Sequence, residues 1–114
     1  MSQQIRKDQT NFITEHDISD FTEYPFTSGG LSLGISSVRG RYPAGGWDVD
    51  NGIEQIWYVM KGSATVEAGD KTYELAEGDM LHIDKGERFS INGTITIMVA
   101  SSPAWTDEQH LHVN

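Results

Sequence analysis

The stretch from Gly45 to Gly62, GGWDVDNGIEQIWYVMKG, decides the fold. It places two carboxylates two residues apart, continues with an apolar run and ends at a glycine. Side chains of a strand alternate between its two faces, so Asp48 and Asp50 share one face if the segment is extended. The next strand repeats this alternation on one of its faces with Gln55, Trp57 and Val59. The pattern indicates strands that lead into a pocket.

Short apolar segments separated by turn residues continue on both sides of this stretch. Gly69 stands at the tip of one expected hairpin, and Asn92-Gly93 is a strong signal for another. About eight short strands at this turn spacing indicate an all-β sandwich or barrel. The clearest strands are expected at residues 31–39, 56–60, 64–68, 72–75, 80–83, 89–91 and 94–100.

The same stretch resembles the first motif of the cupin superfamily, whose members are small jelly-roll barrels. Counting back from Gly62 puts Gln55 at the glutamate position of that motif. The same count puts Asp48 and Asp50 at its two histidine positions. The spacing of the motif is therefore kept, whereas its metal-binding residue types are replaced.

The second cupin motif is matched by GDMLHIDKGERFSING, in which Gly78 and Gly86 keep their spacing. Asp84 replaces the proline, Phe89 replaces the last histidine and Gly93 stands at the asparagine position. The chain also resembles a branch of small cupins that carry R-Y-P-x-x-G-W and P-A-W-x-x-E-Q-H segments, here residues 41–47 and 103–110. The resemblance implies a single cupin jelly-roll barrel.

We expect one domain with two appendages. Residues 1–26 form an N-terminal arm that packs on the barrel or on a partner subunit, because their apolar residues are too irregular for a helix. Residues 27–103 form the barrel. Residues 104–114 form a C-terminal tail, expected to hold one helical turn and to be irregular elsewhere.

Composition limits the class of partner. The chain has seventeen acidic and eight basic residues, so its formal net charge is −9. This charge repels nucleic acid and anionic lipid. The absence of cysteine excludes disulfides and thiolate metal sites. Neither an apolar signal segment nor a membrane-length apolar run occurs, so we expect a cytoplasmic protein.

The four residues at the cupin metal positions offer two carboxylates, one amide and a phenyl ring, namely Asp48, Asp50, Gln55 and Phe89. Transition metals in such barrels need imidazole nitrogens, so we expect no metal and no other cofactor. Three interpretations of the aspartates stay open. They are solvated carboxylates at the barrel mouth, ligands of a hard cation, or a metal-free site in which Asp50 is a catalytic base and Asp48 binds a ligand.

Gln55 and its neighbours on the same face are candidates for ligand binding. A buried amide needs a partner, which is either a backbone group or Asp50, or else a ligand hydroxyl or carbonyl. Trp57 either packs in the core or stacks on a sugar, and Phe89 closes part of a cavity floor. We expect these three side chains to line one cavity.

The remaining candidates are histidines and arginines. His82, between two apolar residues, is either a core histidine or a catalytic acid or base. Arg39 and Arg41 either grip a ligand carboxylate or pair with the two aspartates. His110 and His112 form a metal pair only if the tail is a strand, and a surface tail is the other interpretation.

These residues indicate a protein that binds a small polar molecule. Its enzymatic version would be a metal-independent isomerase or epimerase of a sugar or sugar acid, by resemblance to metal-free cupins that are sugar epimerases. The alternatives are a non-catalytic sensor or accessory domain, and a barrel filled by its own side chains. We also expect a homodimer that pairs through an apolar sheet face, because a net charge of −9 opposes contact elsewhere.

Overall fold

The computed structural model describes residues 1–15 and 17–114. Within these residues it contains nine β-strands and two 3-10 turns. The strands are β1 (Asn11–Glu15), β2 (Ser19–Tyr24), β3 (Ser32–Tyr42), β4 (Trp47–Asp50), β5 (Glu54–Ala68), β6 (Lys71–Ala76), β7 (Met80–Ile83), β8 (Arg88–Ser102) and β9 (His110–Val113). The turns are η1 (Lys7–Gln9) and η2 (Asp107–Gln109). No helix in the described part of the chain has the length and hydropathy of a membrane span.

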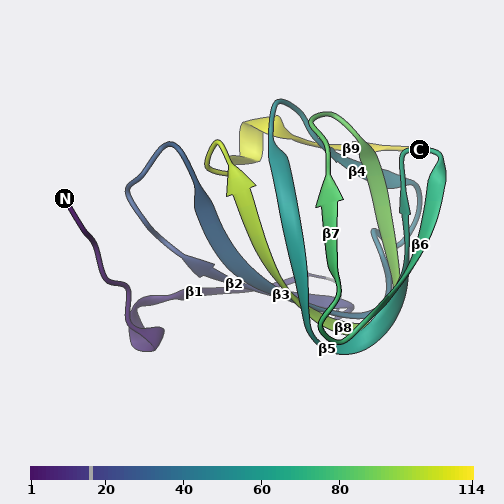
Figure 1. Cartoon of the computed structure of the whole chain (residues 1–114), viewed down its shortest axis with the longest axis horizontal. Coiled ribbons are helices and arrows are strands. Elements are labelled where there is room, and N and C mark those ends of the chain that lie inside the picture. The colour runs from purple at the N-terminus through teal and green to yellow at the C-terminus, as the bar shows by residue number, and fades with distance from the viewer. Residues whose placement is uncertain (16) are drawn as a thin grey trace.

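All nine strands belong to one sheet that curls into a half-open barrel (Figure 1). Its order is β1-β2-β3-β8-β4-β9, and β5 joins it along β8 while also pairing with β6 and β7. Every pairing is antiparallel. The all-β barrel predicted from the turn spacing is confirmed.

β5 and β8 are fifteen residues each, longer than the sequence pattern predicts. The predicted hairpin at Asn92-Gly93 is wrong, because β8 continues through these residues. Likewise β5 continues past Gly62, with a register shift between Val59 and Lys61. At both glycines the backbones of β5 and β8 approach each other closely, and the chain does not reverse. A Cβ at Gly62 would lie 2.2 Å from the carbonyl oxygen of Thr94. A Cβ at Gly93 would lie 2.5 Å from the carbonyl oxygen of Ser63. Each long strand therefore bends at a glycine and serves both halves of the barrel.

The N-terminal arm extends the sheet. β2 pairs with β3 and β1 pairs with β2, and the segment before them projects away from the barrel (Figure 1). Arg39 of β3 forms an ion pair with Asp20 of β2, at 2.8 Å between Nη1 and Oδ2. The arm packs on the barrel of its own chain.

The prediction of an irregular tail is wrong beyond its helical turn. η2 supplies that turn, and β9 then pairs with β4 so that His110 stands opposite Asp50 and His112 opposite Asp48. The alternation in the segment His-Leu-His-Val is that of a strand with one polar face. Both imidazoles consequently lie beside the two aspartates.

The barrel interior is packed. Trp57 and Phe89 meet edge to face with ring centroids 5.2 Å apart, among the buried residues Val38, Val59, Val66, Ile91, Ile95 and Ile97. Trp57 is 2% exposed and Phe89 5%. Gln55, Trp57 and Phe89 do come together as predicted, but as core side chains in contact and not as the walls of an open cavity.

Candidate functional site

A buried pair of carboxylates bound to one imidazole lies where β4 meets β9. His110 Nδ1 lies 2.6 Å from Asp50 Oδ1, and its Nε2 lies 3.1 Å from Asp48 Oδ2. Because ionised carboxylates only accept hydrogen bonds, both ring nitrogens donate, and His110 is an imidazolium. The two aspartates are nearly inaccessible, at 3% and 5% exposure, and this cation offsets one of their two negative charges.

The pKa values agree with that protonation state. Hydrogen bonds to Asp48 and then to Asp50 raise the pKa of His110 to about 10, although burial opposes the shift. Burial alone would raise the pKa of Asp48, but hydrogen bonds from His110 and His112 outweigh it and hold the pKa below its ordinary value. Near neutral pH the cluster is therefore one imidazolium between two carboxylates.

Asp50 is saturated with hydrogen bonds. Its Oδ1 accepts from Trp105 Nε1 at 3.0 Å as well as from His110, and its Oδ2 accepts from Gln55 Nε2 at 2.8 Å. Gln55 Oε1 in turn accepts from Trp57 Nε1 at 2.9 Å. Among the partners expected for the amide of Gln55, which were a backbone group, Asp50 or a ligand, the structure shows Asp50. Asp50 therefore orients His110. Its oxygens are used within the protein, which does not favour the predicted role of a catalytic base that reaches a substrate.

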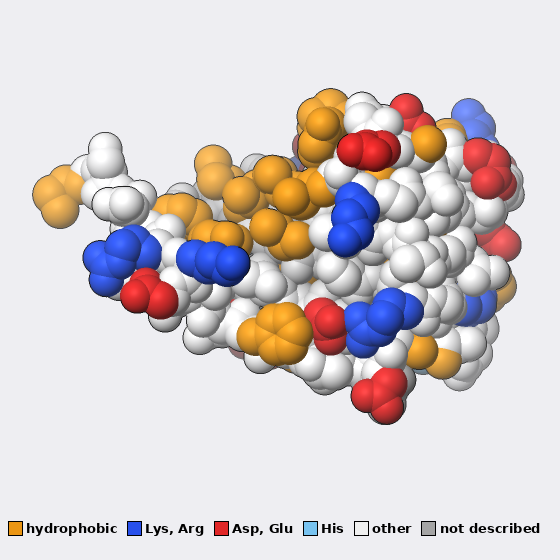
Figure 2. All heavy atoms as spheres, turned by 90° about the horizontal axis from the view of Figure 1, so that it is seen from below, with side chains coloured by type: hydrophobic (Ala, Val, Ile, Leu, Met, Phe, Trp, Pro, Cys, Tyr) orange, Lys and Arg blue, Asp and Glu red, His pale blue; other side chains and the backbone are white. Residues whose placement is uncertain are grey.

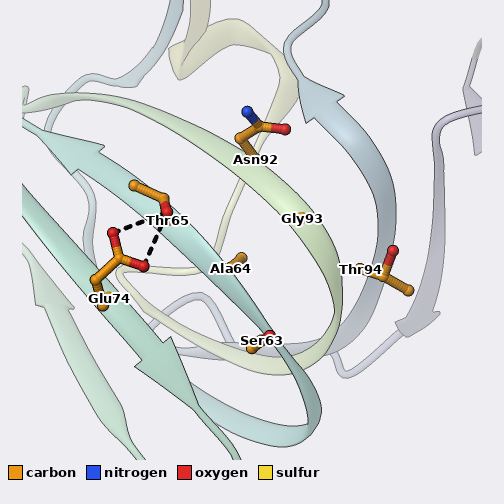
Figure 3. A pocket seen from close by; sticks show the side chains of 7 residues that line it. All are labelled: Ser63, Ala64, Thr65, Glu74, Asn92, Gly93 and Thr94. Carbon is orange, nitrogen blue, oxygen red and sulfur yellow. Dashed lines mark hydrogen bonds between the residues drawn. The ribbon is translucent and has the colours of Figure 1, made fainter.

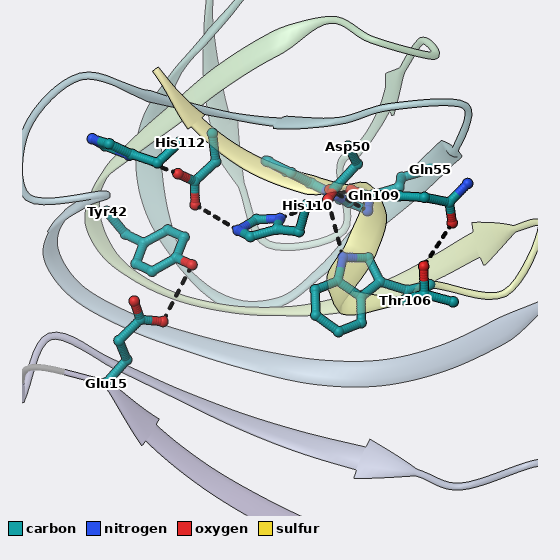
Figure 4. A network of polar contacts seen from close by, with 11 residues as sticks. Glu15, Tyr42, Asp50, Gln55, Thr106, Gln109, His110 and His112 are labelled. Atoms are coloured by element: carbon teal, nitrogen blue, oxygen red, sulfur yellow. Dashed lines mark hydrogen bonds and ion pairs between the residues drawn. The ribbon is translucent and has the colours of Figure 1, made fainter. Parts of the chain in front are cut away.

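A cleft of about 470 Å³ opens beside this cluster. Its wall includes Glu15 from β1, Tyr42 from β3, Asp48 from β4, and His110 and His112 from β9. Figure 4 shows Tyr42 between Glu15 and the two histidines, with its hydroxyl directed to the Glu15 carboxylate at 3.4 Å. Burial, followed by the charges of Asp48 and Glu15, raises the pKa of Tyr42, so the phenol stays protonated and serves as a donor.

Among the described residues, His112 makes a side-chain hydrogen bond through only one of its two ring nitrogens. Its Nδ1 lies 3.0 Å from Asp48 Oδ1, so Nδ1 carries the hydrogen, and in the neutral ring Nε2 keeps its lone pair. The side chain is 48% exposed, in contrast to 28% for His110. A carboxylate that orients an imidazole in this tautomer is the arrangement of a general base.

Sequence reasoning missed most of this cleft. Glu15 belongs to no recognised motif. Tyr42 and Trp105 belong to the R-Y-P-x-x-G-W and P-A-W-x-x-E-Q-H segments, which were interpreted only in terms of the fold. His110 and His112 were recognised as a pair that depends on a strand, and the period-2 alternation of the tail was the signal that supports one.

The two arginine candidates lie away from the buried aspartates. Arg39 is committed to Asp20 on the outside of the sheet. Arg41 donates from Nη1 to the Pro43 carbonyl at 2.7 Å and from Nη2 to the Gly46 carbonyl at 2.8 Å. The predicted pairing with Asp48 and Asp50 is wrong for both. Arg41 instead fixes the turn that forms one lip of the cleft.

The interpretation of His82 as a core histidine is wrong, because its side chain is 51% exposed. β7 pairs with β5 so that His82 stands opposite the exposed Ile56, which puts both side chains on the outer face of the sheet. His82 Nε2 contacts Glu54 Oε2 at 2.7 Å. With Asp84 these residues bring three potential ligand atoms within 4.8 Å of one another, all exposed. This outer cluster shares no residue with the cleft.

A second depression, of about 360 Å³, lies at the bend of the long strands (Figure 3). Glu74 is the one titratable side chain among its described lining residues, and both of its carboxylate oxygens lie 2.9 Å from Thr65 Oγ1. It therefore lacks the paired acid and base groups that the cleft beside Asp48 combines.

The fold and this cleft define a single-domain β-barrel with a carboxylate and imidazole site at its mouth. The family profile described as "Cupin domain" matches residues 40–100. The chain belongs to the cupin family, and the predicted cupin jelly-roll is confirmed. A comparison with curated proteins finds no match.

Solved structures with the same fold include three that cover nearly the whole chain. Pac13 from Streptomyces, described as a nucleoside dehydratase, is 14% identical with a TM-score of 0.89, over 100% of this chain and 92% of that one. An RmlC-like cupin from Shewanella frigidimarina is 17% identical (TM-score 0.77; 94% and 96% covered). KdgF from Halomonas sp. is 16% identical (TM-score 0.74; 95% and 98% covered).

The metal that cupins usually hold does not fit the residues at its positions here. Asp48 and Asp50 are occupied by His110, and both polar atoms of Gln55 are used by Asp50 and Trp57. Phe89, at the last position, has no donor atom. Binding a transition metal would require breaking this buried network and would still lack imidazole nitrogens at those positions.

Proposed function

We propose that this cupin binds an uncharged, hydroxyl-rich molecule of nucleoside or sugar type in the cleft and catalyses a metal-independent proton transfer on it. The observation that carries the proposal is the hydrogen-bonded pair of Asp48 and His112, which lines a cleft that Tyr42 also lines. A volume of about 470 Å³ is within the range of small-molecule sites.

The charge of the cleft selects against anions. Glu15 and Asp48 line it and Asp50 lies directly behind, whereas His110 is the cation held among them. Of the described residues that line the cleft, none is a lysine or arginine. A phosphate or carboxylate would meet this excess of negative charge, so a neutral sugar or nucleoside fits better than a sugar acid.

The chemistry follows from the two groups that reach the cleft. Tyr42 turns its hydroxyl from Glu15 to a substrate carbonyl oxygen and donates its one hydrogen bond there. His112 Nε2 removes the proton from the adjacent carbon, leaving an enolate. The same imidazolium then returns the proton. If the proton goes to a hydroxyl on the next carbon, the C–O bond of that hydroxyl breaks and water is released. If the proton goes back to carbon, the product is an isomer of the substrate. Asp48 holds the imidazolium during the step.

Similarity to Pac13 supports the elimination branch and the nucleoside class. That protein is described as a nucleoside dehydratase and has been solved with uridine, and its fold matches this chain over its full length. The argument for proton transfer itself comes from the residues of this cleft.

The first experiment measures binding. Uridine and uridine 5′-monophosphate are titrated by saturation-transfer NMR as a matched neutral and anionic pair. We expect uridine to bind, and the phosphate to bind at least about tenfold more weakly because of the acidic wall. Equal or tighter binding of the phosphate would contradict the charge argument.

The second experiment measures chemistry. Carbonyl-bearing nucleosides and sugars are incubated in D₂O, and exchange of the proton next to the carbonyl is followed by NMR. We expect His112→Gln to lower the exchange rate by about 100-fold or more, the contribution of a general base. His82→Gln, the same substitution on the outer face, is the control and leaves the rate unchanged. Binding without exchange across the panel would favour the non-catalytic alternative.

A further inference from the structure

The chain contains the dipeptide Asn-Gly twice, at residues 51–52 and 92–93. In this dipeptide the backbone nitrogen of glycine can attack the side-chain amide of asparagine, because glycine has no side chain that hinders the approach. A bond forms from the glycine nitrogen to asparagine Cγ, and the amide nitrogen leaves as ammonia with the proton that the glycine nitrogen gives up. Water then opens the resulting succinimide ring at either carbonyl, which yields aspartate or isoaspartate.

The first copy, Asn51-Gly52, lies in the turn between β4 and β5, and both residues are exposed. The Ile53 N–H donates to the Asp50 carbonyl oxygen at 3.4 Å, which closes a four-residue turn with Gly52, at φ +71°, in its third position. Among the described residues, neither the Gly52 N–H nor the Asn51 side-chain amide has a hydrogen-bond partner. The attacking nitrogen and the amide can therefore meet without loss of a described hydrogen bond.

The second copy, Asn92-Gly93, lies inside β8, which is paired on both sides. Gly93 stands opposite Gly40 of β3 and opposite Ala64 of β5, and Figure 3 shows it on the continuous strand beside Ala64. A Cβ at Gly93 would lie 2.5 Å from the carbonyl oxygen of Ser63, so the backbones are closely packed there. Closing the ring rotates the bond that joins Cα and the carbonyl carbon of Asn92, and this rotation requires the pairing of β8 to open first.

Exposure of the side chain does not separate the two copies, because Asn92 is exposed as well. Figure 2 shows hydrophobic, charged and uncharged polar side chains all at the surface of this barrel, so an exposed side chain does not indicate a free backbone. The difference between the copies is the pairing of the backbone.

We propose that Asn51 is a site of spontaneous deamidation in the folded protein, whereas the pairing of β8 protects Asn92. The reaction would act on the connection between β4 and the C-terminal segment. Asn51 follows the buried Asp50, and its backbone N–H donates to the Gln109 carbonyl oxygen at 2.8 Å, one residue before His110. Isoaspartate inserts a methylene into the main chain at this point and displaces that hydrogen bond relative to the turn. We therefore expect the modified chain to be less stable.

The first experiment compares the two sites in one sample. The full chain is aged at mildly alkaline pH for several weeks, and portions are digested with trypsin at intervals. Cleavage after Arg41, Lys61 and Arg88 puts the two sites on separate peptides, residues 42–61 and 89–114. Mass spectrometry with fragmentation measures deamidation of each asparagine, corrected by a portion digested at the start. We expect Asn51 to react at least about tenfold faster than Asn92, because only Asn92 needs the sheet to open.

The same ageing in guanidinium chloride tests whether the fold causes the difference. Both asparagines precede glycine, and in the unfolded chain neither is paired, so their rates should converge. Equal rates in the native protein, or faster reaction at Asn92, would overturn the proposal. Native protein that stays unmodified at Asn51, over an interval in which the unfolded chain is modified, would overturn it too.

A matched pair of variants tests the consequence for stability. Asn51→Gln keeps the amide but would have to form a larger ring, which closes far more slowly, so its melting temperature should not fall on ageing. Asn92→Gln should lose stability on ageing as wild type does. Freshly prepared Asn51→Asp introduces the charge without the extra methylene and should be more stable than aged wild type.

Aged wild type that keeps its full melting temperature would contradict the expected loosening, as would an equal loss in aged Asn51→Gln. None of these measurements uses a ligand of the cleft, so the outcome is independent of the proposed proton transfer.

Discussion

His110 is the residue on which the buried charge balance depends. It binds one proton between two inaccessible aspartates, and its pKa rises from the ordinary value of 6.5 to about 10. Between those two values the native protein holds a proton that the unfolded chain releases. The contribution of His110 to stability is therefore fully present below pH 6.5 and is lost as the pH rises through 10.

We expect the free energy of unfolding to fall with pH across this window. One extra proton in the native state corresponds to at most about 1.4 kcal/mol per pH unit. Urea denaturation at several pH values between 7 and 10 measures the slope. His110→Gln should be less stable at neutral pH and should have lost most of the slope. Parallel slopes for wild type and variant would show that His110 is not charged in the native state.

The hydrogen bond from Gln55 to Asp50 explains why a glutamine stands at the position of the usual cupin glutamate. Its amide donates to Asp50 at 2.8 Å, and a glutamate there would place a second carboxylate against a buried one. We expect Gln55→Glu to destabilise the protein by about 1–3 kcal/mol at neutral pH, with recovery as the pH falls and one carboxyl is protonated.

A double-mutant cycle provides the control for Gln55. Asp50→Asn combined with Gln55→Glu exchanges the donor and the acceptor, so the double variant should be more stable than additivity of the single losses predicts. Urea denaturation of the four proteins gives the coupling energy. Strict additivity would mean that the two side chains do not interact in solution.

At the residue scale, the sequence predicted which side chains lie together better than it predicted what each of them does. The motif count brought Asp48, Asp50, Gln55 and Phe89 to one place because it depends on the strand period, which the fold obeys. It could not show that Asp50 is saturated or that His82 points outward. Orientation and hydrogen-bond partners depend on strand pairing, and pairing joins residues far apart in the sequence.

At the scale of elements, the bend in β5 and β8 decides how the barrel closes. Gly62 has φ +83° and its missing Cβ would clash with the Thr94 carbonyl at 2.2 Å. We expect Gly62→Ala to lower the free energy of unfolding by about 2 kcal/mol or more, because both backbone strain and overlap oppose it. Gly29→Ala is the control, since a Cβ there meets nothing within 4 Å. Equal thermal stability of the two variants would refute the close crossing.

The same element shows why strand number was easier to predict than strand length. Asn-Gly is a hairpin signal when the chain reverses, but the register of β8 continues through Asn92 and Gly93 against β3 and β5. Glycine permits either outcome, and the choice is made by the partner strands. The turn at Gly69 is local and was predicted at the correct position.

At the scale of the whole molecule, the cleft is assembled from both ends of the chain. Glu15 comes from β1, Tyr42 from the end of β3, and both histidines from β9, whereas the buried core contains no residue of the C-terminal tail. The barrel and the site are therefore separable by deletion. Sequence analysis divided the chain at the same boundary, but could not foresee that the tail supplies the imidazoles.

We expect a chain ending at Pro103 to keep its barrel and lose its cleft. Deletion of residues 104–114 removes His110, His112 and Trp105, and it leaves Asp48 and Asp50 without their cation. Loss of one partner from a buried ion pair costs about 3–5 kcal/mol, reduced here because removal of β9 admits water to the carboxylates.

Circular dichroism should still show a β-sheet protein, with a lower melting temperature that recovers partly at acidic pH as the aspartates are protonated. Uridine binding should be lost, because the cleft loses both imidazoles. A truncated chain as stable as wild type at neutral pH would contradict the charge balance, because two buried carboxylates would then need no cation.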